Sequence, residues 1–99
     1  MIDDMKLNEL AKRAYKCAIA RGKTGKHVNH DKDAAGLIEE VHEFYQAKEK
    51  LESDKMCGYT EAQEELADVL IVCLTELYKR NVDIDEIVEK KIHINELRM

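Results

Sequence analysis

The sequence contains no proline and no tryptophan, and only four of its 99 residues are glycine. Because proline and glycine are the residues that most weaken a helix interior, a chain with so few of them has little that would interrupt helices. Aromatic residues are also few, with four tyrosines and one phenylalanine, whereas Leu, Glu, Lys, Ile and Ala are abundant. No strand pattern, internal repeat or low-complexity linker competes with this preference. The composition therefore favours an all-α fold.

Cysteine is too scarce and too irregularly placed for a cross-linked or zinc-bound protein. The three cysteines, Cys17, Cys57 and Cys73, are an odd number and form no CxxC or Cys/His pattern. Short sequences built on disulfides or on zinc show regular sets of such residues. We therefore interpret all three as thiols without a cross-linking or metal-binding role.

Long apolar stretches and a surplus of positive charge are absent as well. No apolar stretch reaches the roughly 18 residues that a membrane-spanning helix needs, and the first residues, MIDDMKLNEL, are acidic and amphipathic rather than a basic leader. With 16 Lys and Arg against 21 Asp and Glu, the net charge of −5 opposes binding to a phosphate backbone. We expect a soluble, cytoplasmic protein that binds neither membranes nor nucleic acid.

Helical periodicity occurs in four segments of the chain. Two of them have clear start signals, because Thr60 followed by Gln63 and Asp83 followed by Glu86 both have the spacing of a capping box. At this length we expect residues 1–99 to form one domain, an all-α four-helix bundle. The predicted helices cover about Ile2 to Arg21, Asp31 or Asp33 to about Leu51, Thr60 to about Arg80, and Ile84 to near the end.

The third predicted helix has apolar side chains on nearly every side. They are Leu66, Val69, Leu70, Ile71, Val72, Cys73, Leu74 and Leu77. A helix of this kind must be covered on most sides, and three other helices of the same chain are hardly enough to do so. We therefore expect a homo-oligomer, a homodimer or a homotetramer, with the third helix at its centre. A crowded core within one chain is the alternative.

The same helix carries two acids in its most apolar stretch, ELADVLIVCL, which runs from Glu65 to Leu74. Asp68 lies in the middle of this stretch, and Glu65 lies one helical turn before it. Burying an ionised carboxylate without a partner costs several kcal/mol, which is close to the whole stability of a small domain. Some positive charge is therefore expected to compensate Asp68.

The second predicted helix also directs acids from an apolar face. At 100° per residue, Glu40 falls inside the apolar sector, Glu43 lies at its edge and Glu39 lies farther out. Gly36 and Ala47 are on the same side as Glu40 and leave room beside it. The apolar sector is formed by Leu37, Val41, Phe44, Tyr45 and Leu51.

Two helices thus each direct a pair of carboxylates, three residues apart, toward the interior. Packed together, Glu40, Glu43, Glu65 and Asp68 would repel one another strongly unless a cation neutralises them. A site made of oxygen ligands alone selects a hard divalent cation. We therefore predict that Mg²⁺, or Mn²⁺ in its place, binds these four residues.

The fourth predicted helix has polar residues that continue its apolar face toward the C-terminus. An ammonium, an amide and a guanidinium group on one stripe suit an anionic ligand such as a nucleoside triphosphate. Simple solvation of the last turns is the alternative. The buried side is expected at Ile87, Val88 and Ile92, and the polar residues are Lys91, Asn95 and Arg98.

Together these motifs resemble those of the MazG-type all-α nucleoside triphosphate pyrophosphohydrolases. The segment EEVHE at Glu39, Glu40 and Glu43, followed after 21 residues by ELAD at Glu65 and Asp68, resembles the EExxE…ExxD signature of that family. The segment KIHINELR is similar to the KxxxNxxR element that often follows it. The resemblance covers about two thirds of the chain.

This resemblance implies a MazG-like bundle that hydrolyses a (d)NTP to the (d)NMP and pyrophosphate with Mg²⁺, in nucleotide-pool housekeeping. By resemblance, Glu40, Glu43, Glu65 and Asp68 hold the metal, and Glu39 has a supporting, water-orienting part in catalysis. The positions that bind the phosphates and the sugar or base correspond to Lys91, Asn95 and Arg98.

Other interpretations stay open beside this one. A protein on the same fold that only binds a nucleotide, or that acts as an adaptor, would show the same motifs without turnover. A di-iron bundle is disfavoured, because Glu39 with His42 forms a single ExxH where that class needs two; His42 itself is expected at the surface or an interface. Four residues of the first loop are candidates to close over the phosphates: Lys23, Lys26, His27 and His30.

Overall fold

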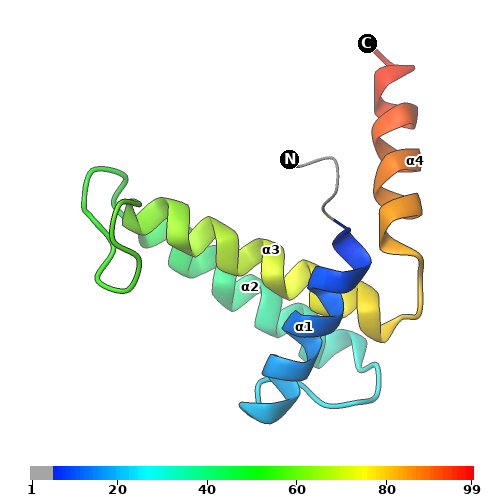
Figure 1. Ribbon diagram of the computed structural model, residues 1–99, viewed down its shortest axis with the longest axis horizontal. Coiled ribbons are helices and arrows are strands. Elements are labelled where there is room, and N and C mark those ends of the chain that lie inside the picture. Colours follow the sequence, from blue (N-terminus) through cyan, green and yellow to red (C-terminus); the bar gives the residue numbers. More distant parts are fainter. Residues whose placement is uncertain (1–5) are drawn as a thin grey trace. The chain divides into compact units, whose positions relative to one another are not determined.

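The computed structural model describes residues 6–99, and within them it contains four α-helices and no strand. The prediction of an all-α fold with four helices is confirmed. The part of the first predicted helix at residues 2–5 lies outside the described residues. Figure 1 shows the helices α1 (Leu7–Ala20), α2 (His30–Gln46), α3 (Glu61–Lys79) and α4 (Ile84–Glu96).

The starts of α3 and α4 follow from the capping residues in the sequence. The Gln63 N–H donates to Thr60 Oγ1 (3.1 Å), and the Thr60 N–H donates to Gln63 Oε1 (2.9 Å), so the predicted capping box is complete. At α4, the Glu86 N–H donates to Asp83 Oδ1 (3.2 Å). These side chains satisfy N–H groups that have no partner within a helix.

Helix α2 differs from the prediction at both ends. Asn29 rather than an aspartate caps its start, because Asn29 Oδ1 accepts a hydrogen bond from the Lys32 N–H (3.1 Å). Its end was predicted at about Leu51, but the backbone at Ala47 is already extended. The Leu51 carbonyl instead accepts the Glu61 N–H (2.8 Å) across the following loop. The helix therefore ends before the apolar residue that continued its pattern.

The chain divides into two compact units, which are described separately. The first consists of the described residues up to His27 and of Leu74–Met99, and the second is Val28–Cys73. Helix α3 begins in the second unit and ends in the first. That residues 1–99 form a single domain stays a prediction. No helix in the described part of the chain has both the length and the apolar character needed to cross a bilayer.

The first unit has a small hydrophobic core between α1, the end of α3 and the start of α4. Ala11, Leu74 and Ile84 are buried there. The partly buried side chains packed against them are Leu7, Leu10, Leu77, Tyr78, Val82 and Val88. Because removing apolar surface from water is the main stabilising term in folding, this core holds the three helix segments together.

The prediction for the buried side of α4 was only partly correct. Val88 packs against the core of the first unit, but Ile87 and Ile92 are exposed in the single chain. The core reaches only the start of α4, where Ile84 is fully buried. Later turns of the helix therefore leave apolar side chains in solvent.

A second set of contacts, the Asn8 clasp, joins the first turns of α1 and α4. Asn8 Oδ1 accepts a hydrogen bond from the Ile84 N–H (2.7 Å), and its Nδ2 donates to Asp83 (2.9 Å) and Asp85 (2.7 Å). In return, Asp85 Oδ1 accepts the Leu7 N–H at the start of α1 (2.8 Å). Each helix thus supplies the cap of the other, and the Asn8 hydrogen bond keeps the pKa of Asp83 below its usual range.

The loop after α1 is held by a lysine that is removed from solvent. Lys79 Nζ donates to Thr24 Oγ1 (2.8 Å) and lies 3.6 Å from Glu76 Oε1, with its side chain 1% exposed. The same Glu76 oxygen accepts from Arg80 Nη1 (2.8 Å). A buried ammonium needs such partners, since an unpaired charge away from water is costly.

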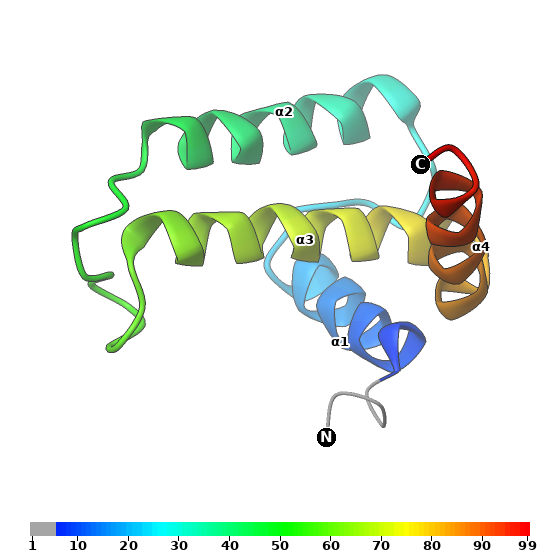
Figure 2. The ribbon, with the colours of Figure 1, turned by 90° about the horizontal axis from the view of Figure 1, so that it is seen from above.

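The second unit is a pair of antiparallel helical segments with little buried surface. Figures 1 and 2 show α2 and the first turns of α3 side by side, joined at one end by residues 47–60. Within residues 28–73, all of which the structure describes, the buried side chains are Ser53 and Ala62. The exposed large apolar residues of this unit are Val28, Ile38, Val41, Tyr45, Leu51, Met56, Tyr59, Leu66, Leu70 and Ile71.

We predict that Asn8→Ala lowers the free energy of unfolding by about 2 kcal/mol, because it leaves the Ile84 N–H without its cap and breaks two further hydrogen bonds. Urea unfolding followed by circular dichroism measures the change. Lys12→Ala is the matched control, since Lys12 is an exposed residue of the same helix. Equal losses in both variants would show that the clasp adds no stability.

Candidate functional site

Glu40 lies in the middle of the less exposed stripe of α2. The half-buried residues in and just after α2 recur at steps of three or four. They are Asp33, Ala34, Leu37, Glu40, Phe44 and Ala47. Val41 and Tyr45 were predicted in the same apolar sector, but they are exposed, and Tyr45 is 83% accessible. Residues at a spacing of three to four share one side of a helix, so Glu40 points to the same side as Leu37 and Phe44.

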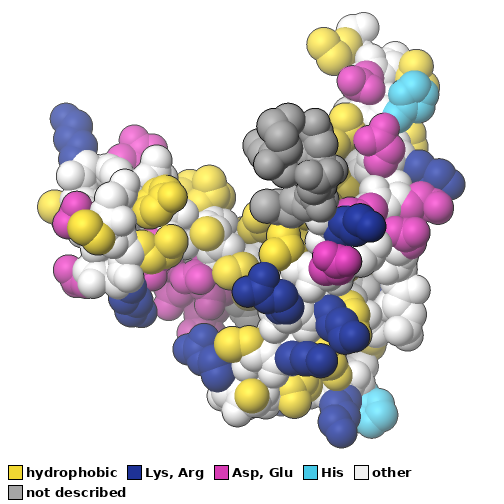
Figure 3. Space-filling view, in the orientation of Figure 1, with side chains coloured by type: hydrophobic (Ala, Val, Ile, Leu, Met, Phe, Trp, Pro, Cys, Tyr) yellow, Lys and Arg dark blue, Asp and Glu magenta, His cyan; other side chains and the backbone are white. Residues whose placement is uncertain are grey.

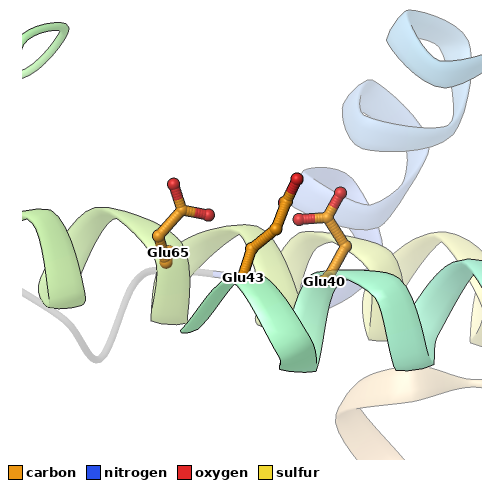
Figure 4. A group of neighbouring side chains, drawn as sticks. All are labelled: Glu40, Glu43 and Glu65. Atoms are coloured by element: carbon orange, nitrogen blue, oxygen red, sulfur yellow. The ribbon is translucent and has the colours of Figure 1, made fainter. Parts of the chain in front are cut away.

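Acids from α2 and α3 come together within the second unit. Glu40, Glu43 and Glu65 each offer a carboxylate oxygen, and these oxygens lie within 4.8 Å of one another. Figure 4 shows the three carboxyl groups on the same side of the two helices, and Figure 3 shows acidic side chains gathered over this part of the surface. We call these three residues the first acidic group.

A second acidic group shares one residue with the first. It consists of Glu64, Glu65 and Asp68, whose oxygens also lie within 4.8 Å of one another. Two ligands on opposite sides of a Mg²⁺ ion are about 4.2 Å apart, so both groups are compact enough to hold a small cation after minor adjustment. Glu65 belongs to both groups and connects them.

The proximity of these carboxylates changes their protonation. Burial, a hydrogen bond to Glu43 and the charges of Glu43, Asp68 and Glu65 raise the pKa of Glu40 from 4.5 to about 7. Burial is also the main cause that raises the pKa of Glu65, followed by the charges of Asp68, Glu43 and Glu64. Lys55 acts in the opposite direction on Glu65. Negative charge therefore outweighs positive charge at the site.

Two oxygen atoms of the site are shielded from water without a hydrogen-bond partner. They are Glu40 Oε2 and Glu65 Oε2, one from each helix. A carboxylate oxygen in this position loses its hydration without forming a hydrogen bond in its place. This is unfavourable unless a proton or a cation binds. Glu43, in contrast, is exposed, so the first acidic group is open to solvent on that side.

Glu64 is the member of the site that sequence reasoning missed. Its neighbour Glu65 was recognised because of the three-residue spacing to Asp68, and adjacent residues on a helix point about 100° apart. In the structure the buried Ser53 hydroxyl donates a hydrogen bond to Glu64 Oε1 and fixes this carboxylate. The sequence carries no signal for that contact, since it joins a loop residue to a helix residue eleven positions away.

Other predicted residues lie outside the two acidic groups. Glu39 is exposed and belongs to neither, and His42 is exposed, as expected for a surface position. Lys91, Asn95 and Arg98 are exposed residues at the end of the chain, in the first unit. Their part in a common site stays a prediction. The loop residues proposed to close over the phosphates are all exposed: Lys23, Lys26, His27 and His30.

Comparisons of the chain with protein-family models, with curated proteins and with solved structures found no match.

We predict that the protein without divalent metal loses stability as the pH rises from about 4.5 to about 7. The folded protein keeps a proton on Glu40 up to about pH 7, whereas the unfolded chain releases it near the ordinary pKa of 4.5. The stabilisation from this proton is complete below the unfolded pKa and is lost as the pH passes the folded one. Chemical unfolding at pH 5 and pH 8 with a chelator measures the change.

Glu40→Gln provides the test, because its amide does not titrate and adds no negative charge. It should remove most of the decrease and be more stable than the parent at pH 8. Glu39→Gln, a change at the adjacent exposed position, should keep the decrease. A parent protein with the same stability at both pH values would contradict the electrostatic description of the site.

Proposed function

We propose that the protein is a Mg²⁺-dependent nucleoside triphosphate pyrophosphohydrolase with a MazG-like bundle, which converts a (d)NTP to the (d)NMP and pyrophosphate. The observation that supports this most directly is the pair of shielded, unpartnered oxygens, Glu40 Oε2 and Glu65 Oε2, within acidic groups from two helices. The EExxE…ExxD resemblance supplies the reaction class.

In this proposal Glu40, Glu43, Glu65 and Asp68 hold the metal. Their donor atoms are all carboxylate oxygens, which suit Mg²⁺ and Mn²⁺ and not the softer metals. The residues fit a cation, since two of the oxygens have no other partner and the pKa of Glu40 shows a deficit of positive charge. Glu64 is a further ligand candidate, because it completes the second acidic group.

The bound ion would activate a water molecule and offset negative charge on the phosphates. The chain's own residues have three tasks around it. A carboxylate of the acidic groups that holds no metal accepts the proton of the attacking water, and Glu39 helps to orient that water. The water adds to a phosphorus atom as the bond between the α- and β-phosphates breaks and pyrophosphate leaves. By the KxxxNxxR resemblance, contacts to the phosphates and to the sugar or base would be made by Lys91, Asn95 and Arg98.

We also propose that the chain works as a homo-oligomer, a dimer or a dimer of dimers, with α3 at the interface. The second unit buries little apolar surface by itself, although Leu66, Leu70 and Ile71 on α3 are about half exposed. On α2, Ile38 is 68% exposed and Tyr45 is 83% exposed. Leu66 and Leu70 are four residues apart and therefore share one side of α3. Exposed apolar surface on one side of a helix is typical of an interface, and a self-complementary contact between two copies is the commonest arrangement.

We predict that the protein releases pyrophosphate from at least one member of a panel of canonical and damaged NTPs and dNTPs with Mg²⁺, and that a chelator stops the reaction. Glu40→Gln should lower kcat by at least about a hundredfold, because it removes a metal ligand. Glu49→Gln should keep the parent's activity, since Glu49 is exposed and belongs to neither acidic group. A coupled pyrophosphate assay provides the measurement.

The melting temperature separates the enzyme from a protein that only binds. Millimolar Mg²⁺ should raise it for the parent and not for Asp68→Asn, which without metal should be at least as stable as the parent because repulsion is reduced. A clear Mg²⁺ effect without turnover on the whole panel would favour a nucleotide-binding or adaptor protein. If neither Mg²⁺ nor Mn²⁺ changes the melting curve, the metal proposal is wrong.

We predict that the parent sediments as a dimer or tetramer at micromolar concentration and that Leu70→Lys shifts it toward the monomer. A charged side chain at the centre of an apolar interface has to be desolvated without a partner. Gln46→Lys introduces the same charge at an exposed polar position of α2 and should leave the assembly unchanged. Sedimentation velocity distinguishes these states, and a monomeric parent would contradict the proposal.

A further inference from the structure

The loop between α2 and α3, residues 47–60, is closed on itself by backbone hydrogen bonds. The Ser53 N–H donates to the Tyr59 carbonyl (2.9 Å), and the Tyr59 N–H donates to the Met56 carbonyl (3.2 Å). An isolated antiparallel bridge joins Glu52 to Thr60 at the base of the loop. The loop is therefore held in one shape by its own contacts.

Ser53 is the centre of these contacts and is 5% exposed. Its Oγ accepts hydrogen bonds from the Lys55 and Met56 N–H groups (both 3.1 Å) and donates its own hydrogen to Glu64 Oε1. A serine hydroxyl has one hydrogen to donate and two lone pairs, so all its capacity is used. The backbone at Lys55 is thereby fixed relative to the carboxylate of Glu64.

Glu64 in turn belongs to the second acidic group, with oxygens within 4.8 Å of those of Glu65 and Asp68. A chain of two hydrogen bonds, from the Lys55 N–H to Ser53 and from Ser53 to Glu64, thus joins Lys55 to the candidate metal ligands. The Lys55 side chain itself is exposed. Because the backbone of Lys55 is held one hydroxyl group away from Glu64, its long side chain can reach the edge of the second acidic group. There its charge partly offsets the rise in the pKa of Glu65.

We propose that Lys55 binds a phosphate group of the substrate at the edge of the second acidic group. This inference rests on the proposed function, to which it adds a residue from outside the EExxE…ExxD and KxxxNxxR motifs. An ammonium group cannot ligate a metal ion and is repelled by one. When a cation binds the carboxylates, the Lys55 ammonium group is therefore expected to pair with a different anion. A lysine suits phosphate because its ammonium group is a compact positive charge.

Removal of the Lys55 charge should affect metal binding and phosphate binding differently. Lys55 competes with a metal ion for the negative field of Glu65, so its removal should leave metal binding unchanged or tighter. The same removal takes away a positive charge from the phosphates, so it should weaken phosphate binding. A lysine that only stabilised the loop would, when removed, weaken both.

Two probes measure these effects separately in the full-length protein. Titration with Mn²⁺ alone, followed by electron paramagnetic resonance, reports metal binding, and calorimetric titration with tripolyphosphate in Mg²⁺ reports phosphate binding without a base or sugar. We expect Lys55→Gln to bind tripolyphosphate roughly tenfold more weakly than the parent and to bind Mn²⁺ at least as tightly. Lys55→Arg should recover most of the phosphate binding, and Lys50→Gln, at another exposed lysine of the same loop, should change neither.

The outcomes distinguish this proposal from the proposed function. If the parent binds tripolyphosphate and Lys55→Gln binds it equally well, Lys55 has no such role and the proposed function stands. Weaker Mn²⁺ binding in Lys55→Gln would show a structural role and would also overturn the proposal. If the parent with Mg²⁺ does not bind tripolyphosphate, both the proposed function and the role of Lys55 fail.

Discussion

Repulsion between carboxylates that converge from two helices is the constraint on which the functional site depends. Glu40 and Glu43 approach Glu65 from α2, while Glu64 and Asp68 surround it on α3. The fold removes two of the oxygens from water and provides no hydrogen-bond partner for them. In the absence of metal the structure responds by raising the pKa of Glu40 to about 7. A proton and a metal cation are alternative solutions to the same electrostatic problem.

The two units differ in the number of contacts that stabilise them. The first unit has its own apolar core and the Asn8 clasp, in which each of two helices caps the other. The second unit carries all five converging acids and has Ala62 as its buried apolar residue. Since burial of apolar surface is what offsets the loss of chain entropy, the acidic site lies where the single chain has least to stabilise it. Cation binding and association with another copy would both supply the missing stability.

The loop between α2 and α3 links local structure to the proposed chemistry. Its shape depends on a single buried hydroxyl, Ser53, which satisfies two backbone N–H groups and one carboxylate. The same contacts fix Glu64 within the second acidic group and hold the backbone of Lys55 near it. In the proposed function, this position would let the Lys55 ammonium group offset negative charge on a metal-bound polyphosphate.

The four helices and the starts of α3 and α4 could be predicted from the sequence because their causes are local. The Thr60–Gln63 capping box and the Asp83 cap join residues three apart, and the pairing of Glu65 with Asp68 follows from one helical turn. The convergence of acids from α2 and α3 was predicted from the sector in which Glu40 lies. The structure brings Glu40 and Glu43 to Glu65, while Asp68 is grouped with Glu65 and Glu64 instead.

What the sequence by itself determined about this protein is thus the set of helices and the acids that each one presents. Only the tertiary structure decided that α2 ends before Leu51, that Tyr45 faces solvent, and that Glu64 joins the site through Ser53. Each of these depends on which parts of the chain lie against one another, and helical periodicity describes only the direction of a side chain from its own axis. Which neighbour occupies that direction is set by packing and by the course of the loops.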